Sequence, residues 1–213
     1  MSWNRSLEET PKHAIFSPSS PWWLNDTDEE IVQRYCSSFA SSIGTVLHDM
    51  ARKHIEHSVK LVKSDRKYIR LSLLEAGIPE TVITRLPDDD IFETMMMYVN
   101  DCIGYRMIPE QKVEYSELFF GTCDAVRFDE REKLLRISDF KSGTSPAKME
   151  QLICYDALYR LQHCQEVRIR PEEIRSELRI YQCGGIRLCT PEPEEIISVM
   201  EFIKAKDNLI LNL

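Results

Sequence analysis

The sequence lacks three features that each mark a large class of proteins: a long apolar run, a glycine-rich tract and a basic excess. No apolar run approaches the roughly 18–20 residues that a membrane helix needs, and only 7 of the 213 residues are glycine. With 43% hydrophobic and 29% charged residues, the composition is typical of a soluble globular protein that can bury one core. The first ten residues include acidic side chains and no apolar segment, so we expect a cytoplasmic protein without a secretion signal or a membrane partner.

The seven cysteines lack the spacing of a zinc site or of a disulfide framework. They are scattered, odd in number and mostly set among apolar neighbours, which favours reduced thiols in a reducing compartment. No two of them form a Cys-x-x-Cys pair, the usual unit of a structural zinc site. The cysteines therefore indicate a reducing compartment and do not indicate a zinc site or a disulfide framework.

The net charge of -8 argues against binding of nucleic acid by broad electrostatic attraction. It does not exclude an enzyme that gathers carboxylates around a metal ion and meets DNA with a local basic stripe. One stretch has such a local excess: Arg52, Lys53, Lys60, Lys63, Arg66, Lys67 and Arg70, opposed by Glu56 and Asp65. This stretch is either a DNA track, in which Lys53, Lys60 and Lys63 are the candidate contacts, or a solvated helix face.

Helical patterns dominate the first half of the chain. Residues 1–26 are rich in Ser, Pro and Trp and predict an extended arm, whereas Thr27 and Glu30 have the spacing of a capping box for a helix to about Ser38. Apolar residues at three- and four-residue spacing predict the remaining helices of this half at about 42–62, 66–76, 79–86 and 88–105.

Strand patterns follow in the second half. Strands are predicted at 112–119, 121–128 and 134–141, then a helix at 146–161, two strands at 175–182 and 186–190 joined by Gly184-Gly185, and a last helix at 192–206. This order predicts an α/β fold in which helices flank a mixed central β-sheet, with an N-terminal helical elaboration. We expect a single domain over 27–213, whose motif-bearing core covers about 42–190.

Two aspartates and a lysine form the most informative pattern. Asp139 and Lys141 are two residues apart on a predicted strand, so their side chains share a face, and a hairpin brings Asp124 alongside. Two adjacent carboxylates repel, and a hard divalent cation such as Mg²⁺ or Mn²⁺ relieves that repulsion. An ammonium beside them can stabilise hydroxide or the negative charge that develops during phosphodiester hydrolysis.

Further residues are candidates for the same site. The backbone carbonyl of Phe140 is a candidate metal ligand, and Glu114, which alternates with Lys112 and Ser116, could point at the site as an extra ligand. A lone Asp-x-Lys is otherwise only a surface ion pair, and a lone helical histidine is usually structural. The setting of Asp139, between an apolar strand and a Ser-Gly pair, favours the site.

Four motifs occur in order along the chain: Gly44-x-x-x-His48, Gly121-x-x-Asp124, Asp139-Phe140-Lys141 and Gln151-x-x-x-Tyr155. Each motif is weak alone, but this ordered set resembles the PD-(D/E)XK nuclease superfamily, in particular its RecB-like exonuclease branch. The resemblance covers about Gly44 to Tyr155 and implies a restriction-endonuclease-like core. It implies that Asp124, Asp139 and His48 bind the metal, that Lys141 is the catalytic lysine, and that Gln151 and Tyr155 line the site.

These motifs also have a physical interpretation of their own. Gly44 has no side chain, which would let its helix approach the sheet closely, and a neutral imidazole four residues later can bind a metal. Gln151 and Tyr155 share a helix face, and both can hydrogen-bond to a phosphate or to a catalytic group. Some relatives carry a four-cysteine iron-sulfur cluster; no Cys-x-x-Cys follows Tyr155 here, so we expect no cluster.

These features predict a divalent-metal-dependent DNA exonuclease for recombination, repair or phage DNA metabolism. No Walker A motif is present, so any helicase action would belong to a partner. An oligomer and a recombination or single-strand-annealing partner are compatible with the sequence, and a phage-encoded enzyme would work in the host-cell cytoplasm. Two alternatives stay open: a structure-dependent or nicking DNA endonuclease of the same superfamily, and a non-catalytic DNA-binding relative.

Overall fold

A computed structural model describes residues 14–212 except residue 168, and the side chains of residues 88, 89 and 165–167 are not described. The chain divides into one compact unit that ends at Ser42 and a second that covers Ile43–Leu213. The boundary between the two units lies inside helix α2 (Ala40–Glu56).

The first unit contains the 3-10 helix η1 (Pro21–Asn25) and helix α1 (Asp28–Ser37). The capping box predicted for Thr27 and Glu30 is present, since the Thr27 N–H donates to Glu30 Oε2 at 2.7 Å. Residues 1–13 of the expected extended arm lie outside the described residues. The described remainder of that arm is not simply extended, because Pro21–Asn25 forms a helical turn and the Trp23 indole donates to the Ser17 carbonyl.

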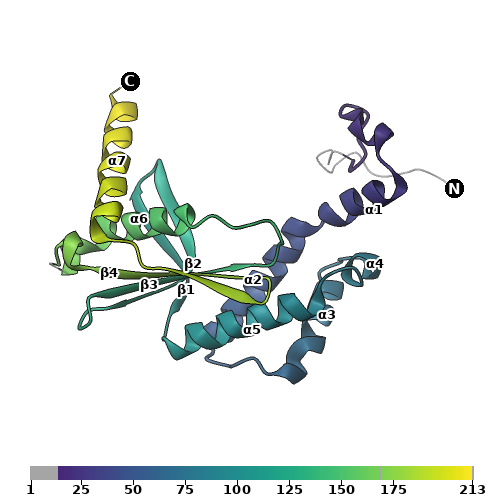
Figure 1. Cartoon of the computed structure of the whole chain (residues 1–213), viewed down its shortest axis with the longest axis horizontal. Coiled ribbons are helices and arrows are strands. Elements are labelled where there is room, and N and C mark those ends of the chain that lie inside the picture. Colours follow the sequence, from purple (N-terminus) through teal and green to yellow (C-terminus); the bar gives the residue numbers. More distant parts are fainter. Residues whose placement is uncertain (1–13, 168, 213) are drawn as a thin grey trace. The chain divides into compact units, whose positions relative to one another are not determined.

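The second unit is built on a five-stranded sheet with strands in sequential order (Figure 1). The strands are β1 (Ile108–Ser116), β2 (Phe119–Asp129), β3 (Leu134–Lys141), β4 (Arg175–Gln182) and β5 (Gly185–Cys189). Strands β3 and β4 are parallel and the other neighbours are antiparallel. Together with the flanking helices, this confirms the predicted α/β fold with a mixed sheet and an N-terminal helical region.

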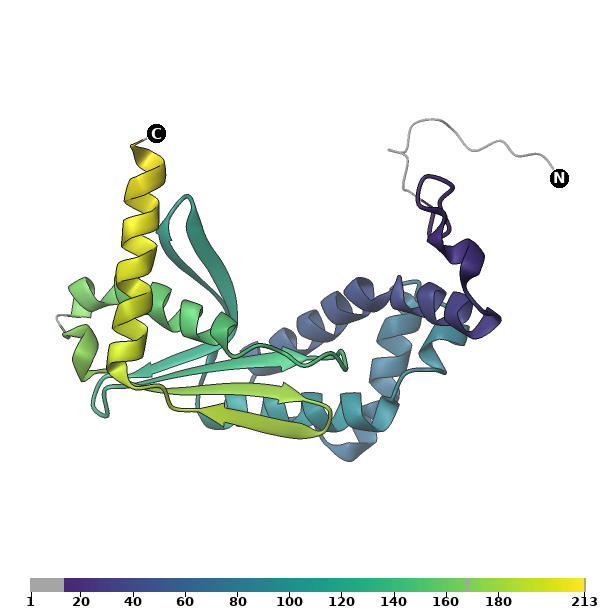
Figure 2. The same cartoon turned by 45° about the horizontal axis from the view of Figure 1, so that its top comes forward.

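Helices cover both faces of the sheet. The helices of the second unit, besides α2, are α3 (Arg66–Glu75), α4 (Glu80–Ile83), α5 (Asp88–Gly104), α6 (Glu150–Val167) and α7 (Pro193–Leu211), with the short 3-10 helices η2 (Lys63–Asp65) and η3 (Pro171–Glu173). Figures 1 and 2 show α5 on one side of the sheet and α6 with α7 on the other. The right-handed connection expected for a parallel pair explains why α6 links β3 to β4 across a face.

The main apolar core lies between the sheet and helices α6 and α7. It is formed by fully buried side chains from all these elements, among them Val113, Leu135, Leu152, Leu178 and Ile196. A buried ion pair also lies on α6, where Arg160 Nε donates to Asp156 Oδ1 at 2.6 Å. The guanidinium also donates to Ser176 Oγ and to the Pro171 carbonyl, so its charge is well compensated.

Several predicted boundaries were wrong, for local reasons. Helix α2 ends at Glu56 rather than near residue 62, because Ser58 adopts a left-handed φ of 54° and Val59 N–H closes the helix on the His54 carbonyl. Strand β1 begins at Ile108, four residues before the predicted start, because Ile108 already pairs with Val126.

The other differences lie in the second half of the chain. Helix α6 begins at Glu150 rather than at Pro146, because the Gln182 amide donates to the carbonyls of Gly143 and Ser145 and holds that segment as a loop. The β4–β5 turn is centred on Cys183 and Gly184, with φ of 49° and 68°, and not on the predicted Gly184-Gly185. Gly185 already pairs with Gln182 as a strand residue. Within the described part of the chain, no helix has the length and apolar character to cross a membrane.

Candidate metal centre

The candidate site lies where β2 and β3 separate. Their backbone pairing ends at Ala125 and Ser138, so Asp124 and Asp139 are the next residues on the two strands. Beyond the last backbone pair of the two strands, the Phe140 N–H donates to a side chain of β2, Asp124 Oδ2, at 2.9 Å. The strand ends therefore bring together Asp124 and the Asp139-Phe140-Lys141 motif, the two parts that the sequence pattern places side by side.

Asp139 is buried and incompletely hydrogen-bonded. Its side chain is only 2% exposed, and Lys141 Nζ lies 3.0 Å from each of its two oxygens. The lysine donates a hydrogen bond to Oδ1, while Oδ2 has no hydrogen-bond partner among the described residues. Buried carboxylate oxygens rarely lack a hydrogen-bond partner, and a bound ion or water is a common partner where the protein supplies none.

Helix α2 and strand β1 add two further residues, His48 and Glu110, to the candidate site. His48 packs its ring 5.3 Å from that of Phe140, and its Nδ1 lies 3.5 Å from Asp124 Oδ2. Glu110 lies opposite Asp124, since the β1–β2 register pairs Pro109 with Ala125 and Gln111 with Cys123. One ligand atom from each of His48, Glu110 and Asp124 lies within 4.8 Å of the others, close enough for one ion.

The sequence prediction missed Glu110 and considered Glu114 instead. The Glu114 carboxylate pairs with the ammonium of Lys112, and its N–H donates to Gln162 Oε1. It does not belong to the group formed by His48, Glu110 and Asp124. Glu110 precedes the predicted start of the strand, and only a register extended to Ile108 would place it opposite Asp124.

The two aspartates of the site ionise less readily than exposed carboxyl groups do. Burial raises the pKa of Asp124 to about 6, although the Phe140 N–H and Lys141 act in the opposite direction. Burial and the neighbouring Asp124 raise the pKa of Asp139 to about 6 as well, and Lys141 opposes them. Burial lowers the pKa of His48, which favours the neutral imidazole that metals bind. Such perturbed groups in one place are typical of functional sites.

Gln151 and Tyr155 extend the site along α6. Gln151 Oε1 accepts a hydrogen bond from Lys141 Nζ at 3.3 Å, and Gln151 Nε2 donates to the Tyr155 hydroxyl at 3.2 Å. The Tyr155 ring in turn packs on Gly121, where a Cβ atom would lie 2.6 Å from Tyr155 Cε1. The second, third and fourth motifs are thus physically connected through Lys141, Gln151, Tyr155 and Gly121.

Gly44 does not have the role expected of it. A Cβ atom at Gly44 would lie 3.8 Å from Ser142 Oγ, which is an ordinary van der Waals distance. The close approach of this helix to the sheet therefore does not depend on the missing side chain. His48, one turn later on the same helix, reaches the site regardless.

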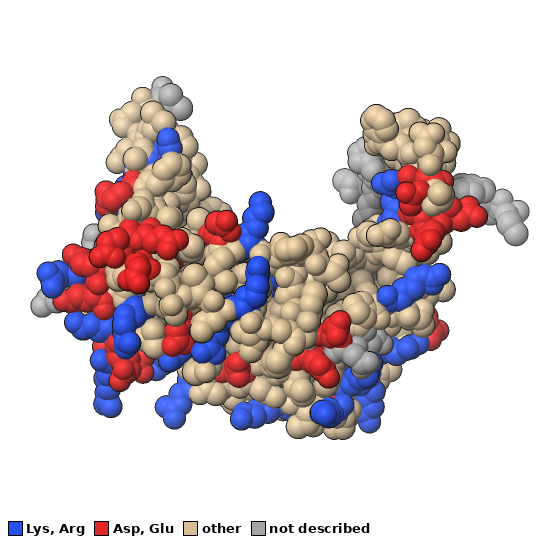
Figure 3. Space-filling model, viewed as in Figure 1, with Lys and Arg blue, Asp and Glu red and all other residues tan. Residues whose placement is uncertain are grey.

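Some of the cations in the basic stretch 52–70 form ion pairs with acidic neighbours. Arg52 pairs with Asp49 and Glu56, Lys53 also pairs with Asp49, and Arg70 pairs with Glu80. Lys60 and Lys63 are exposed in the connection between α2 and α3. Figure 3 shows acidic and basic side chains interspersed across the described part of the visible face.

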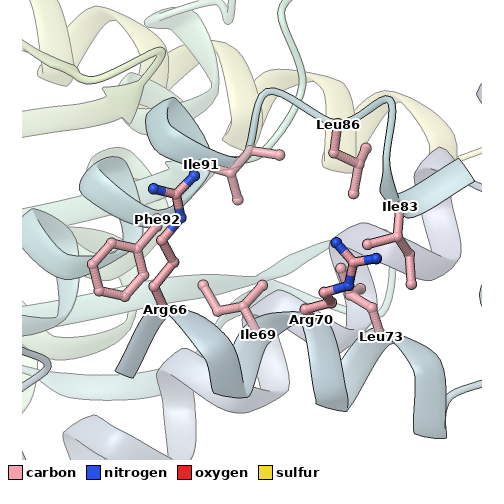
Figure 4. Close-up of a pocket in the computed structure, with 8 residues that line it drawn as sticks. All are labelled: Arg66, Ile69, Arg70, Leu73, Ile83, Leu86, Ile91 and Phe92. Atoms are coloured by element: carbon pink, nitrogen blue, oxygen red, sulfur yellow. The ribbon is translucent and has the colours of Figure 1, made fainter. Parts of the chain in front are cut away.

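A small pocket lies away from the motif residues, between α3 and the segment that leads into α5 (Figure 4). Its volume of about 20 Å³ suits a single water molecule. Its walls are mainly aliphatic, with the side chains of Arg66 and Arg70 at the edge. None of the motif residues lines it.

Comparisons with protein-family models, curated proteins and solved structures found no match to this chain. Residues of the four sequence motifs meet around Asp124, Asp139 and Lys141.

Proposed function

We propose that this protein is a divalent-metal-dependent DNA exonuclease that hydrolyses phosphodiester bonds. The observation that carries the proposal is the buried Asp139 carboxylate beside Asp124, whose Oδ2 has no hydrogen-bond partner among the described residues besides its ion pair with Lys141. A non-catalytic DNA-binding protein has no physical reason to retain such an arrangement, because buried like charges destabilise a fold.

The donor set fits a divalent cation. Carboxylate oxygens of Asp124 and Asp139, the imidazole of His48 and the backbone carbonyl of Phe140 are the proposed ligands for Mg²⁺ or Mn²⁺. Such an ion would lower the pKa of a nearby water and neutralise negative charge on the phosphate. The Asp139 Oδ2, which is ion-paired with Lys141 but has no hydrogen bond from a described residue, and the raised pKa values of both aspartates support this fit.

Lys141 is the proposed electrostatic catalyst. Its ammonium is positioned between the Asp139 carboxylate and the Gln151 amide oxygen, so it can face a phosphate oxygen without free rotation. Positive charge that is positioned in advance stabilises the charge that develops in the transition state. Gln151 therefore acts as a positioning residue for Lys141.

Tyr155 is the proposed hydrogen-bond donor to the DNA backbone. Burial raises the pKa of its hydroxyl, so the group remains protonated at neutral pH. The hydroxyl accepts a hydrogen bond from Gln151, which leaves its own proton available to a phosphate oxygen.

A cleavage assay on paired substrates tests the proposal. Linear and circular DNA are incubated with the purified protein in Mg²⁺ or Mn²⁺, beside Asp139→Ala and Lys141→Ala, with the exposed Lys133→Ala as a matched control. We expect nucleotide release from linear DNA by the wild type and Lys133→Ala only. Nicked circles would show an endonuclease instead. No cleavage of either substrate with any divalent metal would refute the catalytic proposal.

A further inference from the structure

The outer face of strand β2 leads from the candidate metal centre to an exposed aromatic side chain. Phe120, Thr122 and Asp124 alternate with residues that pack inward, so they share one face of the strand. Asp124 belongs to the candidate site, Thr122 is exposed, and Phe120 is 58% exposed. Phe120 precedes Asp124 by four residues, which is about 13 Å along an extended strand.

The β1–β2 hairpin that carries Phe120 is fixed on its inner side. The Glu114 N–H donates to Gln162 Oε1 of α6 at 2.9 Å, and Ser116 Oγ donates to Asp207 Oδ1 of α7 at 2.6 Å. Figure 2 shows the hairpin beside α7. The outer face is therefore presented by an anchored element, and a ligand that binds there does not have to order it first.

Lys112 of β1 lies beside the Phe120 ring. Its ammonium is 5.1 Å from the centre of the ring, and Lys112 pairs through the backbone with Thr122 of β2. Lys112 also forms an ion pair with Glu114, which offsets its charge. The surface therefore offers a ligand an exposed aromatic ring rather than a net positive charge.

We propose that Phe120 is a stacking platform for an unpaired base of the DNA strand whose backbone enters the metal centre. Every base has a flat π-face, so an exposed aromatic side chain can stack on an unpaired base whatever the sequence. One aromatic side chain offers at most about 250 Å², whereas a stable protein interface buries about 800 Å² on each partner. The size of the surface thus favours a base over a protein.

This inference rests on the proposed nuclease and narrows its substrate. A base inside a duplex is already stacked between its neighbours, so only a single strand or an unpaired end can supply a base to Phe120. The protein should therefore prefer single-stranded DNA, or a duplex with an overhang, to a blunt duplex.

Binding of a labelled single-stranded oligonucleotide to the full chain tests the inference. Fluorescence anisotropy is measured in Ca²⁺, which takes oxygen ligands as Mg²⁺ does, and a gel verifies that the DNA stays intact. We expect Phe120→Ala and Phe120→Leu to weaken binding by about 5- to 100-fold and Phe120→Trp to retain it, because only the last keeps a stacking ring. Leu118→Ala is the matched control. It removes another exposed apolar side chain of the hairpin, 49% exposed, and should bind like the wild type.

An abasic nucleotide locates the stacked base. It is placed at each position of the overhang of a partly duplex DNA, with 3′ and 5′ overhangs in separate substrates, because the junction fixes the register. At one position it should weaken binding to the wild type as much as Phe120→Ala does. It should have no further effect on Phe120→Ala, since the same contact is already absent.

The outcomes separate this inference from the proposed function. Equal affinity of the wild type and Phe120→Ala for single-stranded and overhang DNA would overturn the platform even if the protein cleaves DNA. Full binding by Phe120→Leu would also overturn it, because an apolar contact without stacking would then suffice. A loss in Phe120→Ala that the abasic nucleotide reproduces supports the platform even if no metal supports cleavage, in which case the proposed function alone fails.

Discussion

Two buried aspartates of this protein are compensated in opposite ways. Asp156 of α6 receives two hydrogen bonds from Arg160, at 2.6 and 3.4 Å, and the guanidinium is further bound by Ser176 and Pro171. Asp139 of β3 shares its lysine with Gln151 and keeps one oxygen without a hydrogen bond among the residues described. The first arrangement completes a core, and the second is the one that we propose binds a cation.

This contrast offers a way to distinguish structural from functional charges. A buried charge that stabilises the fold has all its partners within the fold. Removal of one partner leaves the remaining charge buried and uncompensated, which strongly destabilises the protein. A buried charge that serves chemistry keeps an unsatisfied atom and a perturbed pKa, at some cost to stability. The predictions below test whether the two aspartates differ in this way.

The largest expected effect concerns activity. Asp139→Asn and Lys141→Ala should each lower cleavage of linear DNA by at least about 100- to 1,000-fold, because Asp139→Asn weakens a proposed metal ligand and Lys141→Ala removes positive charge that stabilises the transition state. Asp139→Asn should not lower the thermal unfolding midpoint, because burial opposes the ionised carboxylate, whereas Lys141→Ala should lower it, because it leaves the buried Asp139 without its ion-pair partner. A cleavage assay together with a melting curve checks this. An Asp139→Asn variant that cleaves DNA normally would show that Asp139 is not a functional charge of the kind distinguished above from the structural Asp156.

The second prediction applies the same test to the structural pair. Arg160→Met should destabilise the fold by about 3–5 kcal/mol, because it leaves Asp156 buried without its partner. The double variant Asp156→Leu/Arg160→Met should recover most of that loss, since it leaves no uncompensated charge. Urea unfolding curves measure the difference. A double variant as unstable as the single one would show that the loss came from packing rather than from charge.

The third prediction concerns the glycine that connects the site to α6. Gly121→Ala should destabilise the protein by about 1–3 kcal/mol, because its Cβ would lie 2.6 Å from the Tyr155 ring. Gly44→Ala is the matched control. It lies inside a helix with ordinary space around it, so the change should instead stabilise the protein by about 0.5–1 kcal/mol. Destabilisation of equal size at both glycines would contradict the packing argument.

Much of the fold and the centre of the site could be predicted because they depend on local patterns. The alternation that places Asp139 and Lys141 together is a property of one strand, and the hairpin that brings Asp124 near them is short. Likewise, the capping box at Thr27 involves residues three apart. Local geometry of this kind is present in the sequence pattern itself.

The remaining features depend on contacts between segments far apart in the sequence. Glu110 reaches the site through a left-handed backbone and through pairing with β2, neither of which its neighbours in the sequence indicate. The alternation pattern predicted Glu114 as a site residue instead, but the Glu114 carboxylate forms an ion pair with Lys112. The late start of α6 similarly follows from Gln182, more than thirty residues away, through hydrogen bonds of 2.7 Å to the preceding loop.

The smallest expected effect is a pH dependence of stability that differs between Asp139 and Asp156. The pKa values of Asp124 and Asp139 are raised to about 6 by burial, from a usual value of about 4. A carboxyl whose folded pKa is raised contributes stability that is fully present below its unfolded pKa and is lost as pH rises through the folded pKa. In metal-free protein, the advantage of Asp139→Asn over the wild type should therefore grow from pH about 4 to pH about 6.

Metal binding should show the reverse trend over the same interval. The ligands must lose their protons before they bind a cation, so Mn²⁺ affinity should fall as pH drops below about 6. Unfolding curves of both proteins at several pH values, with chelator and then with Mn²⁺, measure the two trends together. Asp156→Asn serves as the comparison, since both oxygens of the Asp156 carboxylate accept hydrogen bonds from Arg160. Mn²⁺ should therefore leave the stability difference between Asp156→Asn and the wild type unchanged. A metal-free stability difference between Asp139→Asn and the wild type that stays constant across this interval would mean that Asp139 is compensated as completely as Asp156.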